Sequence, residues 1–136
     1  MESIAQNPTE INTKNKQFMA MYEANRRIDN GAGKPEDVKI ALTNGALFYA
    51  GEAQRITGDK KPLVEKDAEK LKRFKNAGPY GLMAYCSDMI NFLHTEAMKS
   101  GMNNAPETAR KFIDRAKNWQ EVLNSLREEL IKSKEI

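Results

Sequence analysis

Residues 106–130, PETARKFIDRAKNWQEVLNSLREEL, decide the fold class. Apolar side chains recur there at alternating intervals of three and four residues, which is the spacing of a helical heptad seam. The seam consists of Ala109, Phe112, Ala116, Trp119, Leu123, Leu126 and Leu130. At a rise of ~1.5 Å per residue, this helix would be roughly 40 Å long. We expect the seam to pack into the core. The alternative is a homo-oligomer, in which two copies pair through this helix.

Four further segments also repeat apolar residues every three or four positions, at about 8–29, 35–56, 62–77 and 80–100. Gly, Pro and Asn occupy the short gaps between them, and no segment alternates with period two. Short connections favour antiparallel neighbours. The sequence therefore predicts an all-α protein, an antiparallel up-and-down bundle of about five helices. One domain should span residues 1–136, with residues 1–7 and 132–136 frayed.

Composition excludes several classes of protein. The chain has 136 residues and a formal net charge of +3, too small for a broad nucleic-acid-binding surface. A single cysteine cannot form an internal disulfide, which fits a reducing, cytoplasmic setting. The amino terminus lacks the pattern of a secretory signal, and the longest apolar run, residues 45–51, is too short to cross a bilayer. We expect a cytoplasmic protein without membrane contact.

The helix expected at residues 35–56 carries two apolar stripes on nearly opposite sides. One stripe contains Val38, Leu42, Gly45, Tyr49 and Ile56. The other contains Ile40, Leu47 and Gly51, with Ala50 beside it. Both stripes could be covered by neighbouring helices of the same bundle. Alternatively, the second stripe is a groove that receives a helix of another protein, because such helices dock through apolar anchors at helical spacing.

No residue pattern supports catalysis, a metal or a cofactor. Residues 31–34, Gly-Ala-Gly-Lys, resemble the end of a phosphate-binding loop, but Ile28 and Pro35 replace residues that such a loop requires. Cys86 and His94 lie eight positions apart on one expected helix, a rise of roughly 12 Å, so they cannot pair within it. We therefore expect a protein that is not an enzyme.

The excess positive charge falls on the third segment. Residues between Lys60 and Lys75 could form a basic ridge, with Lys66, Lys70 and Arg73 as its centre. Such a ridge would bind nucleic acid through phosphate contacts. Acidic residues interleave with the lysines, however, and no aromatic platform accompanies them, so a solvated helix face is the favoured interpretation. Binding of nucleic acid by a small regulatory protein is the alternative function.

The second expected helix also resembles a known family. Residues 35–38, Pro-Glu-Asp-Val, residues 42–47, Leu-Thr-Asn-Gly-Ala-Leu, and Ala53 resemble the first long helix of the flagellar secretion chaperone family FliS, at the same spacing. Thr43 and Asn44 replace the Tyr and Asp that are usual there. Trp119-Gln120-Glu121 in the last helix is also similar. The resemblance implies a cytoplasmic, non-enzymatic export chaperone that holds a disordered segment of its substrate, flagellin in that family, as helices along apolar grooves.

Overall fold

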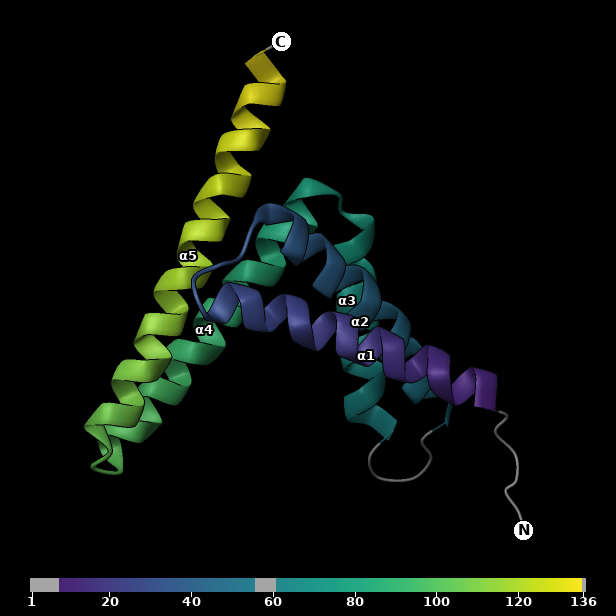
Figure 1. Cartoon of the computed structure of the whole chain (residues 1–136), viewed down its shortest axis with the longest axis horizontal. Coiled ribbons are helices and arrows are strands. Elements are labelled where there is room, and N and C mark those ends of the chain that lie inside the picture. The colour runs from purple at the N-terminus through teal and green to yellow at the C-terminus, as the bar shows by residue number, and fades with distance from the viewer. Residues whose placement is uncertain (1–7, 56–60, 136) are drawn as a thin grey trace.

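A computed structural model of the chain describes residues 8–55 and 61–135, with the surroundings of side chains 15–55 and 65–134. The described residues form five helices, α1 (Pro8–Asp29), α2 (Pro35–Arg55), α3 (Lys61–Asn76), α4 (Pro79–Met102) and α5 (Pro106–Glu135). Successive helices pack on one another, and Figure 1 shows α5 running back alongside α4. The prediction of an all-α bundle of about five helices is confirmed.

The helix bounds differ slightly from those expected from the sequence. Helix α4 extends by one residue at its start and two at its end, and α5 continues through residues 132–135, where fraying was expected. Residues 1–7, also expected to fray, lie outside the described part of the chain. Figure 1 shows that the carboxyl-terminal turns of α5 project beyond the other helices.

Local interactions fix where two of the helices begin. At the start of α2, the Asp37 carboxylate reaches back to accept the Lys34 backbone N–H at 2.9 Å, as in a capping box, and the Arg27 Nε at 2.8 Å. Asp37 is only 8% exposed, so these bonds compensate its burial. Gly78 precedes α4 with φ of +63°, a conformation that a glycine adopts without steric cost.

One hydrophobic core joins all five helices. It contains Ala24 and Ile28 of α1, Leu71 of α3, the inner faces of α4 and α5, and four residues of α2: Val38, Ala41, Leu42 and Ala46. Ile56, expected in the same stripe as Val38 and Leu42, lies outside the described residues. The heptad seam of α5 supplies Ala116, Trp119, Leu123 and Leu126 to this core, with Phe112 packed against it. Leu130 is half-buried and Ile131 is exposed. The seam therefore serves the bundle itself along most of its length.

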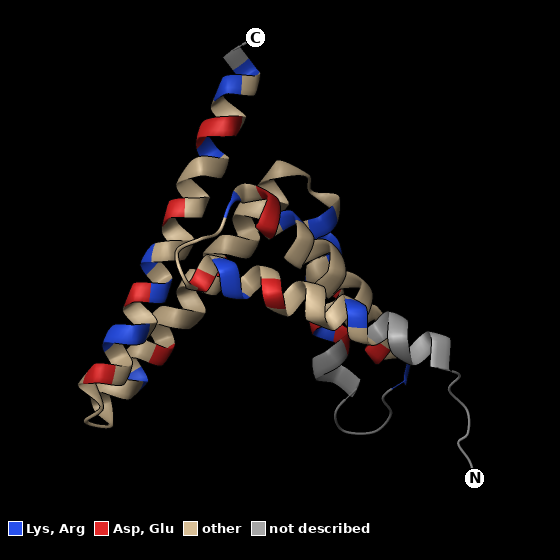
Figure 2. Ribbon diagram, viewed as in Figure 1, with Lys and Arg blue, Asp and Glu red and all other residues tan. Residues whose placement is uncertain are grey.

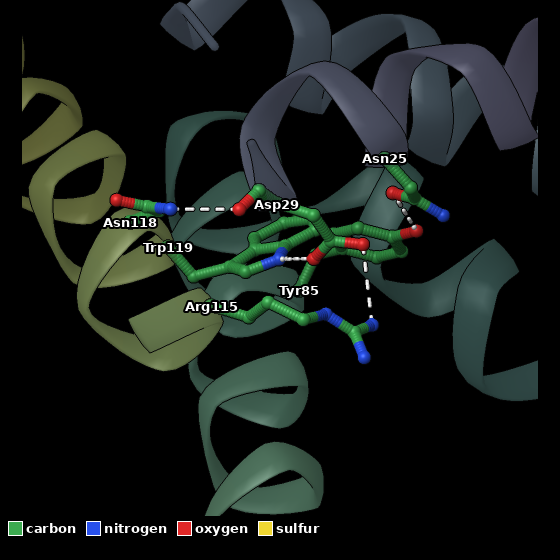
Figure 3. A network of polar contacts seen from close by, with 6 residues as sticks. All are labelled: Asn25, Asp29, Tyr85, Arg115, Asn118 and Trp119. Atoms are coloured by element: carbon green, nitrogen blue, oxygen red, sulfur yellow. Dashed lines mark hydrogen bonds and ion pairs between the residues drawn. The ribbon is translucent and has the colours of Figure 1, made fainter. Parts of the chain in front are cut away.

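Asp29, at the end of α1, ties that helix to the middle of α5 (Figure 3). Its carboxylate accepts hydrogen bonds from Trp119 Nε1 at 2.7 Å and from the Arg115 guanidinium at 3.2 Å. Its backbone carbonyl accepts a third bond, from the Asn118 side chain at 2.7 Å. A carboxylate at a helix carboxyl end is otherwise unfavourable, so these donors stabilise its placement there.

Charged side chains of both signs are interspersed along the helices (Figure 2). None of the helices in the described ranges is long and apolar enough to cross a membrane.

Candidate functional site

A cavity of about 420 Å³ opens between α1, α2, α3 and α4. Six apolar or aromatic side chains form most of its wall: Tyr49, Leu71, Phe74, Tyr85, Met89 and Phe92. Four polar side chains complete it: Asn25, Asp67, Lys70 and Asp88. We call these ten residues the aromatic groove.

Burial differs strongly from the floor of the aromatic groove to its edge. Tyr85 and Leu71 belong to the core, with 7% and 8% of their surface exposed. Phe74 and Met89 are half-buried, whereas Phe92 is 52% exposed. An exposed phenylalanine beside a cavity leaves apolar surface in water, and such surface commonly marks a binding site.

The floor of the aromatic groove is fixed by contacts to two other helices. The Tyr85 hydroxyl donates a hydrogen bond to Asn25 Oδ1 of α1 at 2.9 Å (Figure 3). The Tyr85 ring packs against the Trp119 ring of α5, with 5.9 Å between ring centroids. Burial raises the pKa of Tyr85 to about 12, so its hydroxyl stays protonated as a donor.

Two carboxylates stand at the edge of the aromatic groove. Asp88 Oδ2 of α4 pairs with Lys70 Nζ of α3 at 2.7 Å, and both side chains are 43% exposed. Asp67 of α3 makes no ion pair with any residue whose side chain the structure describes. Burial raises the pKa of the Tyr49 phenol, and the negative charge of Asp67 raises it further. The groove is therefore apolar at its floor and acidic at its edge.

The aromatic surface continues beyond the cavity along α1 and α2. The ring of Tyr49 contacts Phe48 edge-on at 5.2 Å between centroids, Phe48 contacts Phe18 at 5.3 Å, and Phe18 stacks with Tyr22 at 6.3 Å. Phe18 and Tyr22 are exposed. A second cavity, of about 410 Å³, runs from Tyr22 towards α5 and shares Asn25 and Met89 with the first. Apart from Tyr22 and Met89, this second cavity is lined by polar and charged side chains, among them Arg26, Asp29 and Arg115, so the surface becomes polar towards α5.

The four residues predicted as a partner-binding stripe lie on α2, outside the aromatic groove. Leu47 is 45% exposed and Ala50 is exposed, while Gly51 is half-buried. Ile40 packs against the core and is half-buried. Leu47 and Ala50 of this stripe are therefore accessible to solvent, whereas Ile40 is partly covered by the core. On the opposite side of α2, a Cβ on Gly45 would lie 2.9 Å from Met21 Sδ, so the Met21 side chain of α1 packs directly against this glycine.

The basic ridge of α3 is partly neutralised. Lys70 is held by Asp88, as described above, whereas Lys66 and Arg73 are exposed and have no ion-pair partner among the described side chains. Asp67, Glu65 and Glu69 lie on the same helix and are also exposed.

The residues considered for catalysis are not brought together. Cys86 is fully buried in the core, and burial raises the pKa of its thiol to about 12, whereas His94 is exposed on the same helix. Within the described residues, no group of three or more His, Cys, Asp or Glu side chains could hold a metal ion. Residues 31–34 form the turn between α1 and α2, and Gly31 has a φ of +85°.

The sequence did not predict the aromatic groove. The nearly uncharged middle of α4 is typical of a buried helix and does not distinguish Tyr85, Met89 and Phe92 from the core residues beside them. One feature in the sequence could have pointed to the groove: Asp88 is an isolated carboxylate in the otherwise nearly uncharged middle of α4. A charge within an apolar helical segment indicates a position at the edge of the buried face.

Comparisons with known proteins yield no relative. No family model matches the chain, and neither a curated protein nor a solved structure matches it significantly.

Proposed function

We propose that this chain is a non-enzymatic protein-binding helical bundle that holds an amphipathic helical segment of another protein in the aromatic groove. The observation that carries the proposal is the exposed Phe92 at the edge of a cavity walled by Tyr49, Phe74, Tyr85 and Met89. A partner helix that buried this surface would gain free energy in proportion to the apolar area removed from water.

The shape and chemistry of the site favour a helix as the occupant. Two cavities that share Asn25 and Met89 form an elongated surface along α1 and α4. Amphipathic helices bind such surfaces through side chains spaced three, four and seven residues apart. Phe92, Met89 and Tyr22 offer separate apolar contacts along it.

The resemblance to the flagellar secretion chaperone family extends this proposal to a more specific role. In that role the chain would be a cytoplasmic export chaperone, and the partner would be an aggregation-prone substrate with a disordered segment that folds on binding. The stripe of Leu47, Ala50 and Gly51 would be a second docking surface on the same bundle, supported by the exposure of Leu47.

A photo-crosslinking experiment in the native cell tests the proposal. Benzoylphenylalanine replaces Phe92 in one variant, Leu47 in a second and Ile113 of α5 in a third; all three side chains are exposed, so the bundle should tolerate the changes. We expect one dominant crosslinked protein from position 92 and little from position 113. Crosslinking to the same proteins from all three positions would contradict a dedicated groove. Crosslinking from position 47 alone would place the partner on the α2 stripe.

A matched pair of substitutions measures the energy of the contact. Phe92→Ala should weaken binding of the captured partner at least tenfold, because hot-spot aromatic side chains contribute about 2 kcal/mol or more. The midpoint of thermal unfolding should change little, since half of the Phe92 surface is already in water. Ile113→Ala is the control and should leave binding unchanged. Equal losses of binding and of stability in Phe92→Ala would assign Phe92 to folding instead.

The alternative function, binding of nucleic acid, rests on the exposed Lys66 and Arg73. It is weakened by the Asp88 carboxylate, which lies 2.7 Å from Lys70 Nζ and offsets the positive charge at the centre of the ridge. Fluorescence anisotropy with a labelled oligonucleotide at several salt concentrations tests it, since phosphate contacts make binding fall steeply with salt. A flat salt response, or no effect of Arg73→Glu, would exclude this function.

A further inference from the structure

The edge of the aromatic groove has an excess of negative charge. Its lining contains two carboxylates, Asp67 and Asp88, and a single cation, Lys70. Asp67 and Asp88 come from different helices, α3 and α4, and the packing of these helices brings both to one cavity. Asp67 also lies close enough to Tyr49, another residue of the groove, for its negative charge to raise the pKa of the Tyr49 phenol in addition to the effect of burial.

One alkylammonium group already stands at the edge of the groove. Lys70 lines the same cavity as Tyr49, Phe74, Tyr85 and Phe92, and its Nζ lies 2.7 Å from Asp88. Aromatic faces attract such cations, and a guanidinium group can also stack on them and pair with a carboxylate through two hydrogen bonds. Exposed ion pairs such as Lys70–Asp88 are weak, so an arriving cation can replace Lys70 with little loss.

We propose that the groove selects partner helices that carry an arginine or lysine beside their apolar face, and that this cation binds between Asp67 and Asp88 over the aromatic rings. The proposal rests on the proposed function and specifies the chemistry of the partner. The apolar residues of the helix bind the floor at Tyr85 and Met89, and the basic residue fixes its register and direction. A helix with an acidic residue at that position is repelled by the same two carboxylates.

A peptide-display selection provides the probe. The library encodes helical peptides with leucine at fixed positions spaced three and four residues apart and with all other positions random. It is selected in parallel on four immobilised proteins: the wild-type chain, the Asp67→Asn/Asp88→Asn double variant, the Phe92→Ala variant and Asp114→Asn. The last is the charge control, because Asp114 is exposed on α5 outside the groove. Circular dichroism and thermal unfolding confirm that all four proteins are folded.

We expect enrichment of arginine or lysine at one position of the peptides bound by the wild-type chain and by Asp114→Asn. The enrichment should disappear with the double variant. One selected peptide is then synthesised in two forms, one with arginine at the enriched position and one with citrulline there. Citrulline keeps the shape of arginine and removes its charge. Citrulline should weaken binding to the wild-type chain roughly tenfold, as expected for a cation over aromatic rings with a carboxylate partner, and should not change binding to the double variant.

The possible outcomes separate this inference from the proposed function. Peptides that depend on Phe92 but show no basic enrichment would overturn the charge selectivity and leave the apolar groove in place. Basic enrichment that persists in the double variant would also overturn it, because the cation would then bind elsewhere. If no peptide depends on Phe92, both the groove and its selectivity fail.

Discussion

Trp119 and Asp29, ninety residues apart in the chain, share a hydrogen bond of 2.7 Å between the indole Nε1 and a carboxylate oxygen. Trp119 is fully buried, so the bond satisfies a donor that water cannot reach. It also fixes the end of α1 against α5, and thereby helps to set the position of Asn25, one turn earlier on α1, at the floor of the aromatic groove.

Removing the acceptor should destabilise the bundle. Asp29→Ala leaves the buried Trp119 N–H without a partner, so we expect the free energy of unfolding to fall by about 1–3 kcal/mol. Asp29→Asn keeps a carbonyl oxygen that can accept the bond and loses mainly the charge of the partly buried pair with Arg115, so its loss should be smaller than that of Asp29→Ala. Urea unfolding followed by circular dichroism measures both values. Equal losses in the two variants would show that the negative charge, and not the indole bond, stabilises this contact.

Helices α3 and α4 meet closely at Gly81, which is buried. A Cβ at this position would overlap the Phe74 backbone carbonyl, and backbone cannot move aside as a flexible side chain can. Gly81→Ala should therefore reduce the free energy of unfolding by about 3 kcal/mol or more, as severe overpacking does. It should also displace Phe74, which lines the groove.

Gly101, near the end of α4, is the matched control for Gly81. A Cβ there has no heavy atom within 4 Å among the described surroundings, so Gly101→Ala should raise the free energy of unfolding by about 0.5–1 kcal/mol through helix propensity. Thermal unfolding of both variants measures the contrast. A stable, well-folded Gly81→Ala protein would mean that α3 and α4 are not packed as described.

Cys86 should resist thiol reagents in the folded protein. Burial raises the pKa of its thiol to about 12, and the thiolate is the reactive form. We expect very slow reaction with Ellman's reagent near neutral pH and complete reaction in concentrated guanidinium chloride. Cys86→Ser is the negative control, because the chain has one cysteine and this variant has none. Labelling of the native protein at the rate of the unfolded chain would place this side chain at the surface.

Stability should decline at alkaline pH. The pKa values of Tyr85 and Cys86 rise from 10.0 and 9.0 to about 12 on folding, so the folded state holds protons that the unfolded chain releases. This stabilisation is complete below about pH 9 and is lost as the pH rises towards 12, with a slope of up to ~1.4 kcal/mol per pH unit for each group.

Urea unfolding at pH values between about 8 and 11 tests this dependence. The loss of stability over this range should be smaller in Cys86→Ala and in Tyr85→Phe than in the wild-type chain, because each variant lacks one titrating group. Parallel curves for the three proteins would show that other groups cause the alkaline decline.

The helices were predictable from the sequence because each depends on local residue order. The alternating three- and four-residue spacing from Phe112 to Leu126 places these side chains on one face of a helix, and that face packs into the core. Pro35, Gly78 and Pro106 mark positions where helices end or begin. Burial along the seam follows from the same period, and Trp119 lies in the core as expected.

The aromatic groove was not predictable because it depends on how the helices are placed relative to one another. Asp67 and Asp88 are 21 positions apart and lie on two different helices. The spacing of apolar residues within each helix does not reveal how the two helices pack, so it could not predict that both carboxylates line one cavity. Phe92 has the same apolar character as Leu93 beside it, yet 52% of Phe92 is exposed and Leu93 is fully buried. The placement of the neighbouring helices around α4 decides this difference, and the packing of helices is set by many contacts at once.

The tilted contact between the Tyr85 and Trp119 rings gives the molecule an intrinsic fluorescent reporter. Tyr85 lines the groove and also touches the single tryptophan of the chain, so an occupant that shifts the phenol ring alters the surroundings of the indole. The intrinsic emission of the unlabelled protein should therefore change when the groove fills, and helices that bind only at Leu47 should leave that emission as it was.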